Sequence, residues 1–260
     1  MNSPDGSYDL SLIICCYNEA EILEENFRRV VAYLDRLKLS CELIIVEDCS
    51  QDDTPNIIRR LVEERPDLPV KTIFHKKNIG RGGAVKTGLL ASRGKVAGFI
   101  DIDLEVPEWY ILPCVLPILE GDFNVVTGYR TYKLHFNFFL LSRHMLSHGY
   151  RWLLRLLLKT RLKDTETGYK FFHREKILPV LKITQSNHWF WDTEIMLLSE
   201  HNGLKIKEIP CLFIRNANKT STVKVYRDSL KYLIEVVRYK RRKNALNEKM
   251  KSKKVQGDKK

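Results

Sequence analysis

The first hundred residues alternate between two hydrophobic periods. Short apolar runs rich in β-branched residues predict buried strands, and the longer segments between them carry apolar residues at helical spacing. The predicted strands are Leu10–Cys16, Glu42–Val46, Val70–Phe74 and Val96–Ile100, and the predicted helices are Glu19–Leu37, Thr54–Arg65 and Gly83–Ser92. Such regular alternation predicts an α/β fold with a mostly parallel central sheet and helices on both faces.

The second half of the chain has a less regular pattern. It predicts strands at Phe123–Thr127, Thr167–His173, Leu204–Ile209 and Cys211–Ile214, the last two separated by Pro210, and helices at Glu175–Leu181, Trp191–His201 and Ser229–Arg241. There is no internal repeat. We expect one domain over residues 1–240 and a basic, disordered tail over residues 241–260.

Carboxylates follow three of the four predicted strands in the first half. They are Glu19 after the first strand, Glu47, Asp48, Asp52 and Asp53 after the second, and Asp101, Asp103 and Glu105 after the fourth. Each alone is also typical of a helix cap or a turn. Together they lie at the sheet edge where α/β proteins bind ligands, and they repel one another unless a cation offsets their charge. Oxygen ligands favour Mg²⁺ or Mn²⁺.

The positive charge is concentrated at the end of the chain. The 260 residues include 44 Lys and Arg against 32 Asp and Glu, a formal charge of +12. Eleven of these basic residues and two acidic residues lie in Arg238–Lys260, so the rest of the chain is nearly balanced. This distribution argues against a surface that coats nucleic acid, and we expect no nucleic-acid partner.

A second basic region lies in the middle of the chain. Residues 123–163 contain no acidic residue and eight Lys and Arg, interleaved with Phe, Trp and Leu. This pattern predicts a membrane-facing segment at residues 134–163, although a core helix with a solvated basic face has the same pattern. Each basic residue of the tail would add about 1 kcal/mol of attraction to anionic lipid. We therefore expect an anionic membrane surface as a partner.

Cysteine spacing and hydropathy bear on the compartment. The six cysteines show no C-x-x-C spacing, which favours reduced thiols. The first residues, MNSPDGSYD, do not resemble a signal peptide, and no run of about 18 apolar residues predicts a spanning helix. We expect a cytoplasmic protein that binds peripherally to the cytoplasmic face of a membrane.

Four segments carry a family resemblance. In order and spacing, Ser11–Glu19, Glu42–Thr54, Asn78–Ala84 and Ile100–Leu104 resemble the inverting family 2 glycosyltransferases of the GT-A fold. The likeness is greatest to the polyprenyl-phosphate (dolichyl-phosphate) mannose and glucose synthases, and it covers roughly residues 8–240. It implies transfer of a hexose from a nucleoside diphosphate sugar, a GDP- or UDP-hexose, to a polyprenyl phosphate.

The resemblance also implies a donor site. Its residues would be Cys16, Tyr17, Glu19, Asp48 and Ser50 around the base and ribose, and Arg81, Lys86 and Asp101 nearer the sugar and phosphates. A tight turn is the alternative for the glycines beside Arg81. Asp101 and Asp103 match the D-x-D motif that holds a divalent ion, and Glu105 would add a third carboxylate where the mannose synthases usually have Gln.

On the acceptor side, Asp164–Phe172 resembles the motif D-x-x-(S/T)-G-(F/Y). The candidates for binding the acceptor phosphate or the departing diphosphate are Arg130, Arg143, Lys163, Lys219 and Ser221. Asp192 would be a base for a hydroxyl acceptor, whereas with a phosphate acceptor, already anionic near pH 7, it would only orient the sugar. Alternatively, Asp192 stabilises the helix that begins at this point, because the helix dipole favours a carboxylate in the first turn. With Asp103 and Arg130, it completes the candidate catalytic residues.

Three other functions compete with this interpretation. The nearest is the same transfer to a sugar hydroxyl of a glycan or polysaccharide. A nucleotidyltransferase is disfavoured because Cys-Tyr-Asn-Glu stands where a Gly-rich, basic loop would follow the first strand. A non-catalytic binding module would depend on Arg238–Lys260, whereas an enzyme would keep turnover on a water-soluble acceptor without it.

Overall fold

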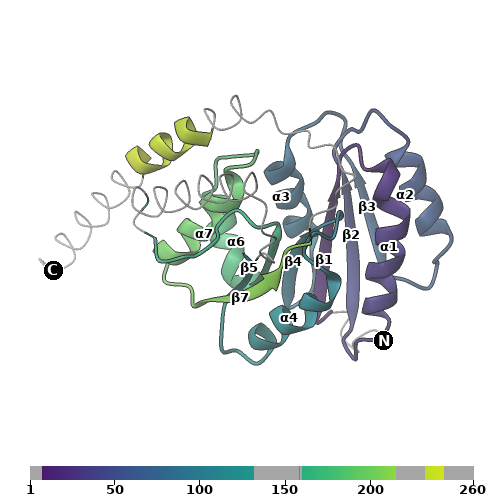
Figure 1. The fold of residues 1–260 in the computed structure, drawn as a ribbon, viewed down its shortest axis with the longest axis horizontal. Helices are drawn as coiled ribbons and strands as arrows, with labels where there is room; N and C mark the ends of the chain where they lie inside the picture. The colour runs from purple at the N-terminus through teal and green to yellow at the C-terminus, as the bar shows by residue number, and fades with distance from the viewer. Residues whose placement is uncertain (1–7, 132–157, 159, 215–231, 243–260) are drawn as a thin grey trace, which may run out of the picture.

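The computed structural model describes residues 8–131, 158, 160–214 and 232–242, and Figure 1 shows how its elements are arranged. In chain order they are β1 (Leu10–Cys16), α1 (Ala20–Leu34), β2 (Cys41–Glu47), α2 (Thr54–Glu63), β3 (Val70–Phe74), α3 (Arg81–Ala91), β4 (Val96–Asp101), η1 (Glu108–Tyr110), α4 (Ile111–Leu119), β5 (Val125–Thr131), β6 (Tyr169–His173), α6 (Arg174–Lys182), α7 (Trp191–His201) and β7 (Ile206–Leu212). A last described helix spans residues 232–242.

The strands form one sheet of seven in the order β3-β2-β1-β4-β6-β5-β7. Strands β1 to β4 run parallel, β6 runs antiparallel to both neighbours, and β7 is parallel to β5. The predicted α/β fold with a mostly parallel sheet is therefore confirmed. The register pairs Cys16 with Glu47 and Cys15 with Asp101, so the carboxyl ends of β1, β2 and β4 reach the same edge.

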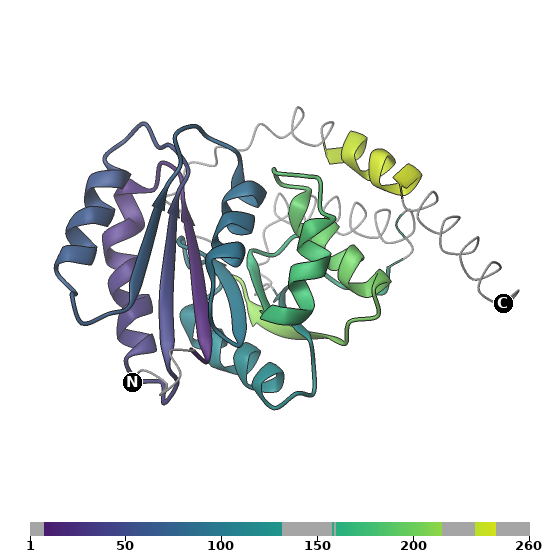
Figure 2. The ribbon, with the colours of Figure 1, turned by 180° about the vertical axis from the view of Figure 1, so that it is seen from behind.

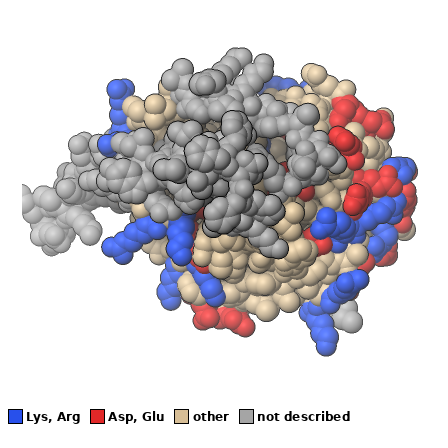
Figure 3. Space-filling view, viewed as in Figure 1, with Lys and Arg blue, Asp and Glu red and all other residues tan. Residues whose placement is uncertain are grey.

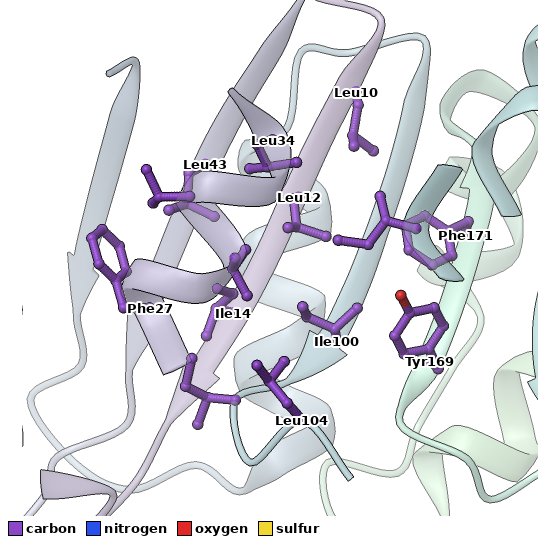
Figure 4. Packing of buried hydrophobic residues seen from close by; sticks show 14 of the residues in the cluster. Leu10, Leu12, Ile14, Phe27, Leu34, Leu43, Ile100, Leu104, Tyr169 and Phe171 are labelled. Carbon is purple, nitrogen blue, oxygen red and sulfur yellow. The ribbon is translucent and has the colours of Figure 1, made fainter. Parts of the chain in front are cut away.

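Helices cover both faces of the sheet (Figures 1 and 2). Leu12 and Ile14 of β1 belong to the core beneath α1, α2 and α4, whereas Ile13 belongs to the core beneath α3, α6 and α7. Figure 4 shows the first of these cores, where Phe27 of α1 and Phe171 of β6 pack with the β1 residues. The alternation of side chains along a buried strand thus supplies both cores.

Two elements differ from the sequence prediction, and proline is involved in both. β7 is one continuous strand, so the predicted break at Pro210 was wrong. β7 lies at the edge of the sheet and pairs with β5 on one side only. A proline, which has no N–H to donate, is tolerated in such an edge strand. Helix α4 was not predicted, since Pro113 and Pro117 interrupt its sequence, but its apolar residues still pack into the core.

Both signs of charge are interspersed over α1 and α2. Arg28 contacts Glu24 and Glu64, and Arg60 contacts Glu24. Figure 3 shows blue and red atoms side by side in the region where Figure 1 places α1 and α2. These exposed pairs contribute little stability. Within the described part of the chain, no helix has the length and apolar character needed to cross a bilayer.

Glu42 is buried at the amino-terminal end of the sheet and joins three segments. One oxygen accepts the Ser11 hydroxyl at 2.5 Å and the Arg93 backbone N–H at 2.7 Å, and the other accepts the Arg93 guanidinium at 3.0 Å. The carboxylate therefore fixes the turn between α3 and β4 against β1 and β2. This end of the sheet lies opposite the edge where the strand-end carboxylates gather.

We predict that Glu42→Gln lowers the free energy of unfolding by about 1–3 kcal/mol, because the buried side chain loses its negative charge and one of its two acceptor oxygens. Urea denaturation followed by circular dichroism measures this change. Glu63→Gln, at an exposed position of α2, is the matched control and should change stability by less than about 0.5 kcal/mol. Equal effects of the two variants would contradict the structural role of Glu42.

Candidate active site

The segments that follow β1 and β2 interlock at the carboxyl edge of the sheet. The Ser50 hydroxyl accepts the Asn18 N–H at 3.0 Å, and the Asn18 side chain accepts the Gln51 N–H at 2.8 Å. Glu47 accepts the amides of Cys49 and Ser50, so this carboxylate closes a turn, as one reading of the sequence allowed. Asn18 and Cys49 both have positive φ, 54° and 64°. The loop geometry here is therefore set by side-chain hydrogen bonds.

Three of the predicted donor residues line this edge with different exposures. Cys16 is buried at the end of β1, Tyr17 is 43% exposed beside it, and Glu19 is partly buried, its N–H bonded to Thr54 at 2.9 Å. The exposed ring of Tyr17 is available to a planar ligand at the sheet edge. The role of these residues in binding a base stays a prediction.

Asp48, the first residue beyond β2, is only 3% exposed. Its carboxylate accepts the N–H groups of Ile79 at 3.0 Å and Gly80 at 2.9 Å, and it lies 2.8 Å from His75 Nδ1. Three N–H groups therefore converge on one buried carboxylate. They tie the end of β2 to the turn that begins α3.

Arg81, the first residue of α3, joins two carboxylates from opposite sides of the site. Its guanidinium contacts Asp101 Oδ1 at 2.6 Å and also bonds Oδ2 of Asp192, in the first turn of α7. Lys170 of β6 reaches the other oxygen of Asp192 at 2.9 Å. Asp192 is 2% exposed and Lys170 is fully buried. The cluster thus balances two cations against two carboxylates.

Burial acts on the two cations of this cluster with different results. Burial opposes the charged form of Arg81, but Asp101 and Asp192 more than offset it, and the pKa of Arg81 is raised. Burial lowers the pKa of Lys170 below its usual range, although Asp192 opposes the shift. Lys170 also donates to the Thr167 carbonyl. The site therefore keeps Arg81 charged and holds Lys170 by a dense set of contacts.

The D-x-D segment turns sharply after β4. The buried Asn26 side chain donates to the Ile102 carbonyl at 2.9 Å, Asp103 accepts the Glu105 N–H at 3.2 Å, and Leu104 has a φ of 49°. Asn26 of α1 therefore holds the backbone between the two aspartates. This contact joins residues 76 positions apart, and the sequence analysis did not identify it.

Asp101 and Asp103 are chemically suited to hold a divalent cation. Both are oxygen donors at the sheet edge, and Gly168 leaves the space that Asp101 occupies, because a Cβ there would lie 1.7 Å from Asp101 Oδ2. Among the described residues, no three His, Cys, Asp or Glu side chains gather into a possible metal site. The roles of Asp101, Asp103 and Glu105 as metal ligands stay predictions. A diphosphate would have to supply the remaining oxygens.

Arg130 lies near the end of β5 and pairs with the acceptor-side motif. It contacts Asp164 through two nitrogens, at 2.7 and 2.9 Å, and Glu166 at 3.6 Å. Burial opposes ionisation of Asp164, but Arg130 more than offsets it and lowers the pKa of that carboxyl. Lys163 lies over the Tyr129 ring at 4.5 Å. No acidic residue lies near Arg130 in the sequence, and its partner Asp164 lies 34 residues further along the chain.

The C-terminal helix, residues 232–242, contacts Thr193 and Glu194, the two residues that follow Asp192 in the first turn of α7. The Tyr232 hydroxyl lies 2.5 Å from the Thr193 hydroxyl, which in turn lies 2.8 Å from that of Thr165. Arg242 bonds the buried Glu194, which also accepts the Ser186 N–H at 2.8 Å. Figure 2 shows this helix in yellow beside the α6 and α7 region.

The remaining predicted residues lie elsewhere or outside the described part of the chain. Lys86 donates to the Thr184 carbonyl at 3.4 Å, away from the carboxylates that Arg81 contacts. Arg143, Lys219 and Ser221 lie outside the described residues, as do most of the segment 134–163 and the tail beyond residue 242. Lys170 and His75 were not identified beforehand, although each is a polar residue at or beside an apolar strand, a signal that the sequence does contain.

Known proteins share this fold. The structure resembles glucosyl-3-phosphoglycerate synthase from Mycobacterium tuberculosis in complex with phosphoglyceric acid, with a TM-score of 0.63 and 19% identity over 88% of this chain and 79% of that one. It also resembles the mannosyltransferase PcManGT from Pyrobaculum calidifontis, solved with GDP-Man and Mn²⁺, with a TM-score of 0.57 and 17% identity over 84% of this chain and 60% of that one. These likenesses establish the GT-A fold.

Sequence relatives extend the comparison. A dolichyl-phosphate beta-glucosyltransferase from Dictyostelium discoideum is 31% identical over 222 residues, covering 80% of this chain and 67% of that protein. Glycosyltransferase AglD from Haloferax volcanii is 30% identical over 204 residues, covering 78% of this chain but 32% of that protein. The sequence model of glycosyl transferase family 2 matches residues 11–178. The chain therefore belongs to glycosyl transferase family 2.

Proposed function

We propose that the chain transfers a hexose, with inversion, from a GDP- or UDP-hexose to a polyprenyl (dolichyl) phosphate at the cytoplasmic face of a membrane. An oxygen of the lipid phosphate attacks C1 of the sugar, and the bond from C1 to the diphosphate breaks, so that the nucleoside diphosphate leaves with the electron pair. The named dolichyl-phosphate glucosyltransferase relatives support this acceptor.

The state of Asp192 is the observation that carries the proposal. Each of its oxygens is bound by a cation, one by Arg81 and the other by Lys170, and the side chain is 2% exposed. A carboxylate held in this way is a poor general base, because taking a proton would break a buried ion pair. An acceptor that is already anionic needs no base. The site therefore favours a phosphate over a sugar hydroxyl.

Charge on the departing diphosphate has to be stabilised. Asp101 and Asp103 would hold Mg²⁺ or Mn²⁺, and such an ion supplies electrostatic stabilisation of the leaving group. Structures of fold relatives that contain Mn²⁺ with a nucleotide support this assignment. Arg81 is placed to orient Asp101 and to contribute its own positive charge at the same edge.

A membrane contact fits the described part of the C-terminal helix. Leu233, Ile234 and Val237 are 41–45% exposed on one stretch of this helix, and Lys240 and Arg241 follow them. Exposed apolar residues beside Lys and Arg suit the interface of an anionic membrane. This arrangement supports a peripheral protein whose site receives a lipid acceptor.

We predict metal-dependent release of nucleoside diphosphate from one donor only in the presence of a polyprenyl phosphate. Purified protein is incubated with Mg²⁺ or Mn²⁺ and a panel of GDP- and UDP-hexoses, with and without a short-chain polyprenyl phosphate. Asp103→Ala should lower turnover about 10²–10³-fold, because several kcal/mol of charge stabilisation are lost.

Chelation with EDTA and re-addition of the metal are the control for this assay. Release of nucleoside diphosphate that does not depend on the lipid phosphate, or that requires a sugar hydroxyl, would contradict the proposed acceptor. No release from any donor by the folded protein would contradict the transferase itself and would favour a binding module.

A second prediction concerns Asp192. Asp192→Asn should lower kcat by less than about tenfold with polyprenyl phosphate, whereas loss of a true general base costs about 10²–10⁴-fold. Stopped assays at saturating donor measure kcat, and thermal unfolding checks that the variant is folded. The double variant Asp192→Asn/Lys170→Met is the matched control, since it also removes the buried ammonium left with a weakened partner. A loss beyond about 10³-fold in both folded variants, more than a displaced Arg81 would cost, would contradict the proposal and favour Asp192 as the base for a hydroxyl acceptor.

A further inference from the structure

His75 lies between two segments of the site and contacts both. It is the first residue after β3, and the register pairs Phe74 with Glu47, so His75 lies beside Asp48. Its Nδ1 is 2.8 Å from Asp48 Oδ1, and its Nε2 is 3.1 Å from the Thr87 hydroxyl of α3. The side chain is 13% exposed. The imidazole therefore joins β2, β3 and α3.

The hydrogen bonds around Asp48 assign a direction to one of these contacts. A carboxylate that receives the backbone N–H groups of Ile79 and Gly80 acts as an acceptor, so Nδ1 of His75 donates to it. This holds for the imidazolium and for the neutral tautomer with its proton on Nδ1. The Thr87 hydroxyl also lies 3.1 Å from the Gly83 carbonyl, so the second contact has two available arrangements. The bond to Asp48 has a single arrangement, with Nδ1 of His75 as the donor.

Asp48 in turn fixes the turn that begins α3. Gly80 has a φ of 90°, and a Cβ at this position would lie 2.3 Å from His188 and 2.6 Å from the Asn187 carbonyl oxygen. The Gly83 N–H donates to that same Asn187 carbonyl at 3.0 Å. The turn is therefore held between Asp48 on one side and residues 187–188 on the other.

Arg81 follows this turn directly, so its position depends on the same contacts. Its guanidinium reaches Asp101 at the end of β4 and Asp192 in the first turn of α7. A small rotation of the Gly80 turn would move the guanidinium away from one of the two carboxylates, because the side chain spans both. Geometric errors of about 1 Å in such groups can cost about 10²-fold in rate.

We propose that His75 is a positioning residue of the donor site. Its imidazole fixes Asp48, Asp48 fixes the Gly80 turn, and the turn aims Arg81 between Asp101 and Asp192. The inference rests on the proposed transferase function for its kinetic consequence, but its structural content, the anchoring of the Ile79 and Gly80 amides, is independent of that function.

Two amide substitutions separate the two contacts of the imidazole. In His75→Asn, Nδ2 stands close to the place of Nδ1 and keeps the donor to Asp48. In His75→Gln, the longer amide stands close to the place of Nε2 and keeps the contact with Thr87. His75→Ala removes both contacts, and Thr87→Val removes the second while it preserves the shape of the threonine.

Steady-state kinetics with the active donor tests the proposal. We expect His75→Ala and His75→Gln to lower kcat/KM for the donor about 10–10²-fold, and His75→Asn and Thr87→Val to stay within about threefold of the unsubstituted protein. Melting temperatures are measured for all four variants. If His75 had a purely structural role, the variants with the lowest melting temperatures would also have the lowest activity. Equal loss in His75→Asn and His75→Ala, or rescue by His75→Gln alone, would overturn the proposal.

Hydrogen exchange supplies the readout that needs no activity. The amides of Ile79 and Gly80 should exchange at least about tenfold faster in His75→Ala and His75→Gln than in His75→Asn, since their acceptor is no longer held. If the unsubstituted protein released no nucleoside diphosphate but this exchange pattern appeared, the proposed function would fail and the positioning role would stand. If transfer were active and exchange at these amides were the same in all variants, the positioning role would fail and the function would stand.

Discussion

The arrangement of the site follows from one electrostatic constraint. Parallel strands end at a common edge, and here three of them are followed by carboxylates, so like charges gather in a place that water reaches only in part. Such carboxylates are stable only with N–H donors or cations close to them, and backbone N–H groups bind Glu47 and Asp48. Arg81 meets this requirement for Asp101 and Asp192 together, and Lys170 completes the charge balance. Gly168 leaves room for the pair of Arg81 and Asp101, because a Cβ at its position would lie 2.5 Å from Arg81 Nη2 and 1.7 Å from Asp101 Oδ2.

The fully buried Lys170 shows what this constraint costs. A lysine without solvent contact loses its hydration, and hydrophobic residues of similar volume often replace buried ion pairs without loss of stability. Its side chain faces the core that contains Phe99 and Phe172, with Nζ 5.6 Å from the centre of the Phe99 ring, so a hydrophobic side chain would suit this position equally well. The retained charge therefore has its consequence at Asp192, whose second oxygen would otherwise be unpaired beside Arg81.

The sequence predicts the first half of the molecule well, because β1, β2 and β4 are buried on both faces and α1 and α2 each have one apolar face. The strands before Glu47 and Asp101 could be identified from such runs, and with them the edge at which the carboxylates meet. The Pro210 strand and the α4 helix could not be predicted, since tolerance of proline depends on which neighbours an element acquires. The partner of Arg130 was equally inaccessible, because only the pairing of β5 and β6 brings Asp164 to it. The hydrophobic periodicity of a sequence indicates which residues are buried. The contacts of Pro210, α4 and Arg130 depend instead on the order of the strands in the sheet.

The two contacts between the C-terminal helix and α7 have a thermodynamic consequence. Tyr232 bonds Thr193 and Arg242 bonds Glu194, the two residues that follow Asp192. Anything that favours one position of this helix therefore acts on the helical turn that carries Asp192. By linkage, a surface that binds the helix and a ligand that binds at Asp192 change each other's affinity by the same factor. The exposed C-terminal helix and the buried charged cluster are thus connected through Thr193 and Glu194.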